Sequence, residues 1–495
     1  MKLLLEKLNF KVFPFIFITI GLILLGIHLY FFTDFQPSWY DNVLFNSASA
    51  SLHEGKGFLA DAHPLYNGGR EMLMHGPVYY VLQSWVIGLL GNSHFNFLII
   101  PFICLSLITI ILFRRETKYV AALAVILLLS DAIFSKAIHN GRMDILASFF
   151  IFIIYYLSAY FTNKKKDIIY IAILSGLAFL TTPRIVVLIA PSILWIIYNV
   201  IKSKNYNLLI YLITIPLLMI VAWLYIGFGG LENAFNYFFV EKTMHHNVEG
   251  NLVSKFVGGN WTIFKSQWAA TITFIFLFFL GIFNKTVKSK PWFWIISSTI
   301  LLFYIMVKDV GLYSSLFLPL LYLFISKLSI ETFNRNYQPL LLGVLFFNSL
   351  IIGVKSYYIF YAKEYNTSNT IKQVLTEYTN ETDKICGSLI SYFSVLEVNR
   401  EFRLFCRFEV DMDENMKDII NDKDIDYLIL NTYDQKLFNT YEYPYKLEEV
   451  YEFNHDGAKY LEVKEKLNLT PLKGNFLNPE YELNGMKLYK VKKHI

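Results

Sequence analysis

The chain has 495 residues, of which 55% are hydrophobic, 18% aromatic and only 17% charged, and its formal net charge is +5. About 25% of the residues of a soluble domain are charged, so this composition excludes an ordinary soluble protein and predicts a membrane protein with several spans. Lysines and arginines between spans follow from the positive-inside rule, so the positive net charge does not indicate a nucleic-acid partner.

Apolar runs close to roughly 20 residues, the length of a membrane-spanning helix, recur from residue 12 to about residue 355. The first run has a basic flank, is too long for the apolar region of a signal peptide and lacks a small-residue cleavage site, so we expect an uncleaved span. We predict about eleven spans. They are residues 12–32, 95–113, 119–137, 145–162, 168–182, 185–201, 208–228, 267–283, 291–307, 312–326 and 337–355.

The run at residues 77–91 decides the orientation. It is short for a span, and its apolar side chains follow helical spacing in a single stripe, a pattern typical of a helix lying in the membrane interface. If it does not cross, the N-terminus and the short loops on its side hold sixteen basic residues, and the short loops on the other side hold four. The positive-inside rule then predicts a cytoplasmic N-terminus. The four are Lys136, Arg142, Arg184 and Lys308.

This topology predicts two domains, a helical transmembrane domain at residues 1–355 and an extracytoplasmic α/β domain at residues 356–495. The first has two long outer loops, at 33–94 and 229–266. The C-terminal domain alternates short helical and strand-like segments, which predicts short parallel strands. We expect this domain to contact an acceptor or to cover the active site. Cys386 and Cys406 lie in two of these strands, either as half-buried thiols or, in an oxidising compartment, as a disulfide.

Many ionisable side chains gather near the outer ends of the predicted spans. A charged group at membrane depth costs roughly 2.5–3.5 kcal/mol, so each of them is paired, faces water or has a function. They are Asp41, Glu54, Glu71, His75, Arg142, Asp144, Arg184, Glu241, Lys242, His245, His246, Lys308 and Asp309.

Several of these residues also have a purely structural explanation. Arg142 and Asp144 could form a helix-end pair, in which the helix dipole favours the aspartate and the arginine faces lipid phosphate. Arg184 could snorkel, with its aliphatic chain in the membrane and its guanidinium at the membrane–water interface. His245 and His246 could be solvated loop residues.

Two segments near the N-terminus resemble the GT-C class of glycosyltransferases, in particular the dolichyl-phosphate-mannose protein mannosyltransferases and the bacterial enzymes that add aminoarabinose to lipid A. "WYDNVLFNSASASLHEGKGF" (39–58) is similar to the family's first outer loop, where Asp41 matches the first acid and Asn42 replaces the second. "HGPVYYVLQSWVIGLLGNSHFNFLIIP" (75–101) is similar to a segment with a basic residue and paired tyrosines before an interfacial helix. His75 takes the place of the basic residue, and Gly76 replaces a proline.

Three further segments extend the resemblance over roughly residues 10–355. "GRMDILASFF" matches the acid of the second outer loop, Asp144, with an arginine before it. "GLAFLTTPRIVVLIAP" is similar to a segment whose positive charge Arg184 supplies here, and "KDVGLYSSLFLPLLYLF" combines Lys308 and Tyr313 with a proline-containing span.

The resemblance implies transfer of a sugar from a polyprenyl phosphate to a lipid, glycan or protein acceptor at the outer face of the membrane. Cationic side chains would stabilise the departing phosphate. Asp41 is the expected general base of an inverting displacement, and Asp144 positions the acceptor or holds Arg142 and His75. The phosphate ligands would be Arg142, His75, Arg184 and Lys308, with supporting roles for Glu54, Glu71, Tyr79, Tyr80, Glu241, His245 and Tyr313.

No obligatory metal is expected, because Asn42 replaces the second acid, although His245, His246 and Glu241 leave a zinc site open. Two other classes of function stay possible. A multi-span lipid or glycan transporter or flippase would place charges near the membrane midplane and show internal repeats, and a catalytically inactive scaffold would bind through its C-terminal domain. The composition favours a bacterial inner or cell membrane.

Overall fold

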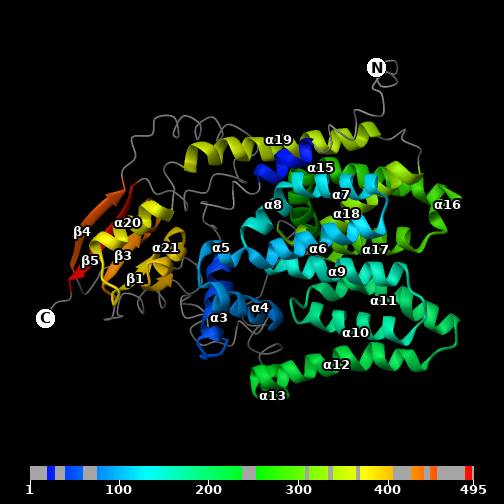
Figure 1. Ribbon diagram of the computed structural model, residues 1–495, viewed down its shortest axis with the longest axis horizontal. Coiled ribbons are helices and arrows are strands. Elements are labelled where there is room, and N and C mark those ends of the chain that lie inside the picture. The colour runs from blue at the N-terminus through cyan, green and yellow to red at the C-terminus, as the bar shows by residue number, and fades with distance from the viewer. Residues whose placement is uncertain are drawn as a thin grey trace.

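The computed structural model describes residues 19–27, 40–58, 75–236, 252–306, 312–332, 338–363, 368–404, 425–439, 446–453 and 485–492. For some of these residues, Asp41 among them, it describes the backbone alone. A bundle of helices fills one side of Figure 1 and a small sheet with its own helices the other.

Helices account for almost all of the described chain up to Lys363, and most of them begin and end within a few residues of the predicted spans. They are α3 (Tyr40–His53), α4 (Val78–Leu90), α5 (His94–Phe97), α6 (Ile99–Arg115), α7 (Lys118–Ser130), α8 (Ala132–His139), α9 (Met143–Ala159), α10 (Lys165–Phe179), α11 (Ile185–Lys202), α12 (Asn207–Phe228), α13 (Leu231–Asn236), α15 (Leu252–Phe283), α16 (Lys285–Lys288), α17 (Pro291–Met306), the 3₁₀ helix η4 (Leu312–Leu316), α18 (Leu318–Lys327), the π-helix η5 (Leu328–Thr332) and α19 (Gln338–Lys363).

Within the described residues, α11 and α12 are each long and apolar enough to cross a membrane unaided. Helices α7 and α8 meet the same standard only together, as a span broken by a 72° bend. The other apolar helices in these stretches are shorter, among them α4, α9, α17 and α18. The number of about eleven spans therefore stays a prediction.

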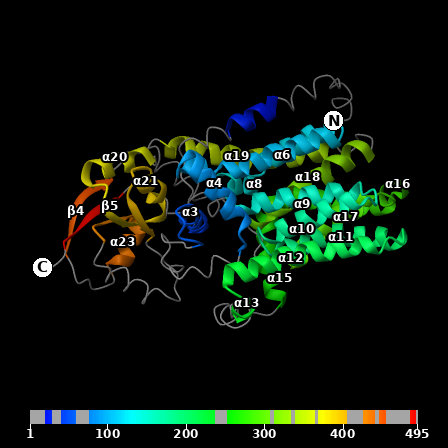
Figure 2. The ribbon, with the colours of Figure 1, turned by 60° about the horizontal axis from the view of Figure 1, so that its bottom comes forward.

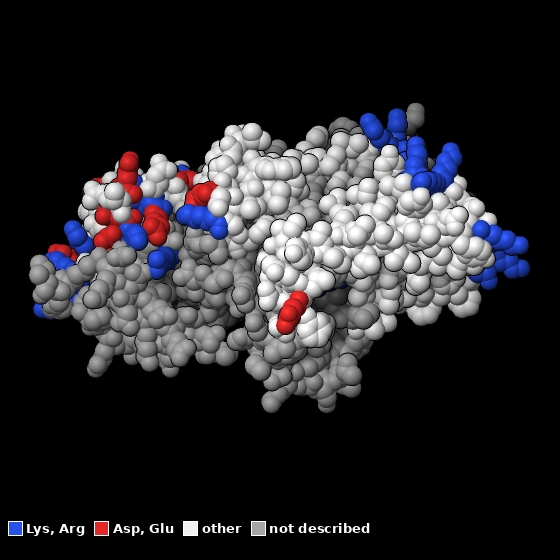
Figure 3. All heavy atoms as spheres, turned by 90° about the horizontal axis from the view of Figure 1, so that it is seen from below, with Lys and Arg blue, Asp and Glu red and all other residues white. Residues whose placement is uncertain are grey.

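The surface of the helical bundle is the kind that contacts lipid. On α12 the side chains of Ile213, Leu218 and Ile226 are 63%, 61% and 75% exposed. Figure 3 shows a broad surface with few charged side chains between the C-terminal domain and a group of basic side chains at the other end. Exposed apolar area on this scale marks an interaction surface, and together with the apolar helices it supports an integral membrane protein.

The basic loops and the two predicted outer arginines lie at opposite ends of the same helices. Helix α9 runs from Arg142 toward residues 164–166, three lysines at the start of α10, and α11 runs from Arg184 to Lys202. This separation is the one that the lysine count predicts, whichever face of the membrane each end occupies.

A buried ion pair joins three helices at the basic end. Lys327, the last residue of α18, pairs with Glu116, which follows α6, and their side chains are 7% and 2% exposed. Tyr156 of α9 donates to the other carboxylate oxygen of Glu116 at 2.9 Å. The ammonium of Lys327 also lies 5.3 Å from the ring centre of Trp292. This pair is therefore a structural tie between α6, α9 and α18.

Asp131 forms the break between α7 and α8. One carboxylate oxygen caps α8 by accepting from the backbone N–H groups of Ile133 and Phe134 at 2.9 and 2.8 Å. The other oxygen accepts from Tyr322 of α18 at 2.6 Å and from Gln267 at 3.0 Å. Gln267 is itself the non-helical residue at which α15 kinks. Asp131 thus ties two helix breaks and α18 together.

The C-terminal domain contains a five-stranded sheet, in the order β2-β1-β3-β5-β4. Strand β1 pairs in parallel with β2 and β3, as the sequence predicts, whereas β5 pairs antiparallel with β3 and β4. The antiparallel pair was not predicted. The elements are α20 (Ser368–Tyr378), β1 (Lys384–Gly387), η6 (Leu389–Ser391), α21 (Tyr392–Glu397), β2 (Glu401–Leu404), β3 (Tyr427–Leu430), α23 (Thr432–Phe438), β4 (Lys446–Phe453) and β5 (Met486–Lys492).

The cysteine prediction keeps both of its alternatives. Cys386 is buried in β1, while Cys406 lies outside the described residues. Figures 1 and 2 both place α21 next to α3 of the helical bundle, with β4 on the far side of the sheet, and Figure 1 also shows α5 beside α21. The C-terminal domain is therefore docked against the helices that begin the predicted site.

Candidate functional site

Arg142 and Asp144 form a buried ion pair at the start of α9. Arg142 is the N-terminal cap residue and Asp144 lies in the first turn, where the helix dipole favours a negative charge. The Arg142 Nε and the Asp144 Oδ2 are 2.6 Å apart, and each residue is only 3% exposed. The spacing in sequence predicted this neighbourhood, but burial places the guanidinium inside the protein and not on a lipid-facing helix end.

A second guanidinium shares an aromatic ring with this pair. Tyr313, in η4, has its ring centre 5.5 Å from the Arg142 Cζ and 4.2 Å from the Arg184 Cζ. Helix η4 packs against α8 and α9, which brings Tyr313 to the start of α9. Arg184 is exposed and precedes α11. Two cationic groups far apart in sequence are therefore held close together.

The start of α4 contacts the turn before α11 through its backbone. The Val78 N–H donates to the Leu180 carbonyl at 3.1 Å. A β-carbon at Gly76 would lie 2.2 Å from the same carbonyl oxygen, and Gly76 has a φ of +72°. Only glycine fits both the conformation and the contact, which explains its presence where the family has a proline.

Tyr79 connects α4 to the residue before Arg142. Its hydroxyl donates to the Gly141 carbonyl at 2.5 Å, and the side chain is fully buried. Burial raises the pKa of the Tyr79 phenol, so the group stays protonated and keeps this hydrogen bond. Tyr79 therefore fixes the turn that carries the arginine.

Helix α4 turns its polar face inward. Tyr80 and Gln83 are fully buried, whereas Trp85 and Leu89 are 64% and 82% exposed. Trp85, Leu89 and Leu90 of the predicted apolar stripe thus face away from the protein, as expected of an interfacial helix in contact with lipid, whereas Val78, Leu82 and Val86 pack partly against the core.

Helix α3 packs on this region through Phe45. The Phe45 ring centre lies 5.7 Å from that of His75, 6.0 Å from Tyr79 and 6.2 Å from Tyr80. Asp41 is in the first turn of α3, one turn before Phe45. The helix that carries the expected base is therefore packed on the two tyrosines and His75.

The structure gathers some predicted residues and places others elsewhere. Arg142, Asp144, Arg184 and Tyr313 form one cluster, which is joined to Tyr79 through Gly141. Tyr80 lies against Tyr79, and His75 lies against Phe45. Glu54 lies beyond the other end of α3, about 20 Å along the helix from Asp41, and pairs with Lys56 at 2.7 Å. Glu71, Glu241, His245, His246 and Lys308 are outside the described residues.

Sequence reasoning missed Asp131 and its partners. The signal was present in "LLLSDAIF", where an aspartate interrupts an apolar run as a helix cap does. Its partners Gln267 and Tyr322 are more than 130 residues away in sequence. No local pattern could have paired them.

Two apolar grooves lie beside the site-bearing helices. One runs between α11 and α17 and is lined by Leu194, Trp195, Ile295, Leu302 and Ile305, among others. The other lies along α4 and is lined by Leu52, Val81, Trp85, Gly88 and Leu89, with His53 and Ser84. Among the described side chains, no three of histidine, cysteine, aspartate and glutamate stand together as metal ligands.

Comparison with known proteins gives a matching family model and a similar fold. A family model of dolichyl-phosphate-mannose-protein mannosyltransferases matches residues 74–226, the stretch that carries Arg142, Asp144 and Arg184. The crystal structure of ArnT from Cupriavidus metallidurans bound to undecaprenyl phosphate has a similar fold, with a TM-score of 0.60, 10% sequence identity, and coverage of 90% of this chain and 97% of that one. The apo structure of the same enzyme gives a TM-score of 0.55, 10% identity, and coverage of 90% and 96%. A search of curated proteins gave no match.

The matched stretch is that of a glycosyltransferase, and the fold is shared with ArnT. The family resemblance predicted from the residues is confirmed, in that the matching model is that of the dolichyl-phosphate-mannose-protein mannosyltransferases. The likeness to ArnT is one of fold.

Proposed function

We propose that the chain transfers a sugar from a polyprenyl phosphate to a lipid, glycan or protein acceptor at the outer face of a bacterial cell membrane. The N-terminus is cytoplasmic in this proposal and residues 356–495 are extracytoplasmic. The polyprenyl phosphate is supported by the similar fold of ArnT, which was solved with undecaprenyl phosphate bound.

The observation that carries the proposal is the pair of guanidinium groups on the Tyr313 ring, 5.5 and 4.2 Å from its centre. Asp144 balances one of these charges. Within the described residues no carboxylate forms an ion pair with Arg184, so the cluster has an excess of positive charge and suits an anion.

The charge change of the reaction explains the need for two cations. The bond between the anomeric carbon and the phosphate oxygen breaks, and its electron pair leaves with the phosphate. A diester with one negative charge becomes a monoester that approaches two negative charges at neutral pH. Cations placed at that oxygen stabilise the transition state more than the ground state, which is the condition for catalysis.

Asp144 is best suited to hold Arg142. A carboxylate 2.6 Å from the guanidinium fixes the direction of the remaining N–H groups. Of the two roles expected from the sequence, orientation of Arg142 is therefore favoured over direct contact with the acceptor.

Asp41 is the proposed general base. It takes the proton from the acceptor hydroxyl or amine as that group attacks the anomeric carbon from the face opposite the phosphate, which inverts the configuration. Its place in the first turn of α3, packed on the start of α4 through Phe45, supports this role. The grooves beside α4 and α11 offer apolar surface for the isoprenoid. No obligatory metal takes part in this scheme.

The test uses purified full-length protein in lipid nanodiscs with an undecaprenyl-phosphate-linked, radiolabelled sugar and membrane extract as the source of acceptor. Wild type should release undecaprenyl phosphate and label an acceptor, and Asp41→Asn should abolish transfer while the protein keeps its yield and thermal stability. Glu54→Gln is the matched control, because it removes a carboxylate from the other end of α3. A fully active Asp41→Asn variant refutes the base assignment.

Two other outcomes bear on the whole proposal. If wild type moves the labelled lipid between leaflets of proteoliposomes without consuming it, the chain is a transporter. If EDTA treatment abolishes transfer and zinc or manganese restores it, the metal-free scheme is wrong.

A further inference from the structure

We infer that the C-terminal domain is part of the donor site, because its helix α21 positions the turn that carries Arg142. The inference rests on the proposed function and adds positioning residues to it, chiefly Phe393 and Tyr392. Both side chains are buried, with 2% of their surface exposed, although they belong to a short helix at the edge of their domain.

Phe393 reaches the Arg142 turn through one intervening ring. The Phe393 ring centre lies 5.6 Å from that of Phe97 in α5, which is fully buried. Phe97 in turn fills the space beside Gly141, where a β-carbon would lie 2.3 Å from the Phe97 ring. Gly141 has a φ of +58° and directly precedes Arg142. The Phe97 ring therefore packs against the tight turn at Gly141, and Phe393 packs against that ring.

Tyr392 contacts the second element of the site. Its hydroxyl accepts from the Asn46 side chain of α3 at 3.1 Å, and Asn46 is fully buried and also donates to Asn92 at 2.8 Å. The neighbouring residue on α3, Phe45, packs on Tyr79. Adjacent residues of one helix thus contact the C-terminal domain and the site.

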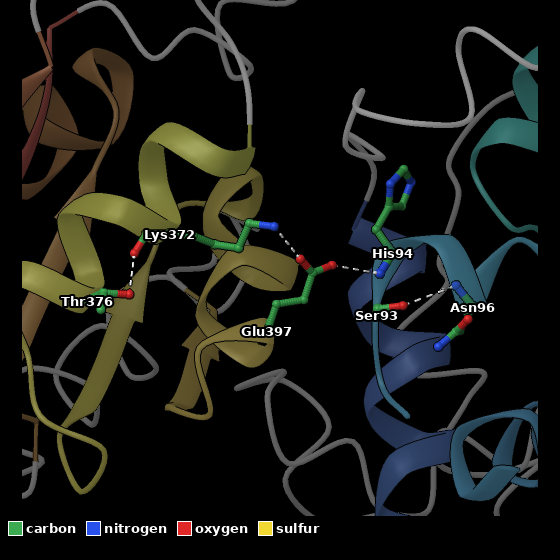
Figure 4. Close-up of polar contacts among 6 residues, drawn as sticks. All are labelled: Ser93, His94, Asn96, Lys372, Thr376 and Glu397. Carbon is green, nitrogen blue, oxygen red and sulfur yellow. Dashed lines mark hydrogen bonds and ion pairs between the residues drawn. The ribbon is translucent and has the colours of Figure 1, made fainter. Parts of the chain in front are cut away.

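Polar contacts complete the interface (Figure 4). One Glu397 carboxylate oxygen accepts from the backbone N–H of His94 at 3.2 Å, and the other pairs with Lys372 of α20 at 2.8 Å. The His94 ring also lies 5.4 Å from that of Phe393. The ring contacts of Phe393, the buried Asn46 amide and the Glu397 carboxylate all lie within one small interface. Together they favour a single orientation of the C-terminal domain on the helical bundle.

This arrangement makes a functional prediction because transition-state stabilisation depends on placement. A displacement of about 1 Å can change a rate about 100-fold. Loss of the Phe393 ring leaves Phe97 unsupported on one side, and the Gly141 turn gains freedom. The affinity of Arg142 for phosphate should fall although no residue that touches the phosphate has changed.

The experiment measures binding of undecaprenyl phosphate to the full chain in nanodiscs, together with the Michaelis constant for the lipid-linked donor. Phe393→Ala should weaken both by about fivefold or more. Phe393→Leu, which keeps an apolar side chain but no ring, should restore only part of the loss. The matched control is Phe453→Ala, which removes a ring that is 1% exposed from β4, on the far side of the same sheet.

Two comparisons keep the inference falsifiable if Phe393→Ala folds poorly. Tyr392→Phe removes only the oxygen that faces Asn46. The double variant Phe97→Leu/Phe393→Leu should lose less affinity for undecaprenyl phosphate than the product of the losses in the two single variants. Phe393→Ala and Phe453→Ala with equal affinities would overturn the inference and leave the proposed function intact. Wild type that neither binds undecaprenyl phosphate nor consumes the donor would overturn the proposed function itself.

Discussion

The two ends of α9 each hold a buried ion pair, and they differ in charge balance. At the basic end, Glu116 and Lys327 cancel one another, and Tyr156 occupies the second carboxylate oxygen. At the other end, Asp144 and Arg142 also form a pair, but Arg184 adds a further positive charge over the same tyrosine ring.

This difference separates a structural ion pair from a candidate binding site. Burial alone does not distinguish them, since all four paired side chains are at most 7% exposed. An ion pair whose charges cancel and whose hydrogen bonds are made ties helix ends together. An additional cation beside a buried ion pair leaves net positive charge that can bind an anion. Three substitutions test this comparison.

The largest expected effect is on stability at the basic end. Glu116→Gln removes the carboxylate that pairs with the buried Lys327 ammonium, so the free energy of unfolding should fall by about 3–5 kcal/mol. Thermal unfolding in detergent, followed by the loss of monodisperse protein, measures this. The double variant Glu116→Gln/Lys327→Met should recover much of the loss, and a single variant as stable as wild type would show that the pair is not a structural tie.

Arg142→Ala should instead act on activity. Loss of one cation at the departing phosphate should lower kcat/KM about 10²–10³-fold and raise the KM for the lipid donor. Steady-state kinetics with the lipid-linked sugar measure this. Because Asp144 is then left buried alone, Arg142→Ala/Asp144→Asn is needed as well, and it should regain stability without regaining activity. An unchanged donor KM would favour a simple helix-end pair.

The smallest effect is expected at the ring between the arginines. Tyr313→Leu removes cation–π contacts worth about 0.5–1 kcal/mol, so the donor KM should rise about two- to fivefold. Tyr313→Phe keeps the ring and should behave like wild type. Equal loss in both variants would show that the hydroxyl, and not the ring, is what the site uses.

Much of the helical architecture could be predicted because apolar length and lysine placement are local signals. Helix α11 was expected at residues 185–201 and occupies Ile185–Lys202. Helix α4 was expected at residues 77–91 from its apolar stripe and occupies Val78–Leu90. The 72° break at Asp131 was not predicted, because the partners that make a buried carboxylate tolerable come from α15 and α18. The antiparallel β4 was also missed, since its charged sequence "KLEEVYEF" lacks an apolar run.

The site was predictable in composition and not in connection. The spacing of Arg142 and Asp144 indicated their pairing, and the family resemblance indicated Arg184. Their meeting over Tyr313 depends on how η4 packs on α8 and α9, which no sequence spacing encodes. The contact of Phe393 with Phe97 joins residues almost 300 positions apart.

Helix α12 has the length and the exposed apolar surface from which we expect a dependence on bilayer thickness. Its 22 residues span about 33 Å, close to the roughly 30 Å of a hydrocarbon core. Only 11% of the most apolar stretch of the helix is buried in the protein. The surface of such a helix mostly contacts lipid, so the helix tilts when the surrounding membrane is thinner. It packs along α10, whose end at Leu180 holds α4 and leads into Arg184. We therefore expect hydrophobic mismatch to act on the arginine cluster, and the catalytic rate to vary with the acyl-chain length of the surrounding lipid.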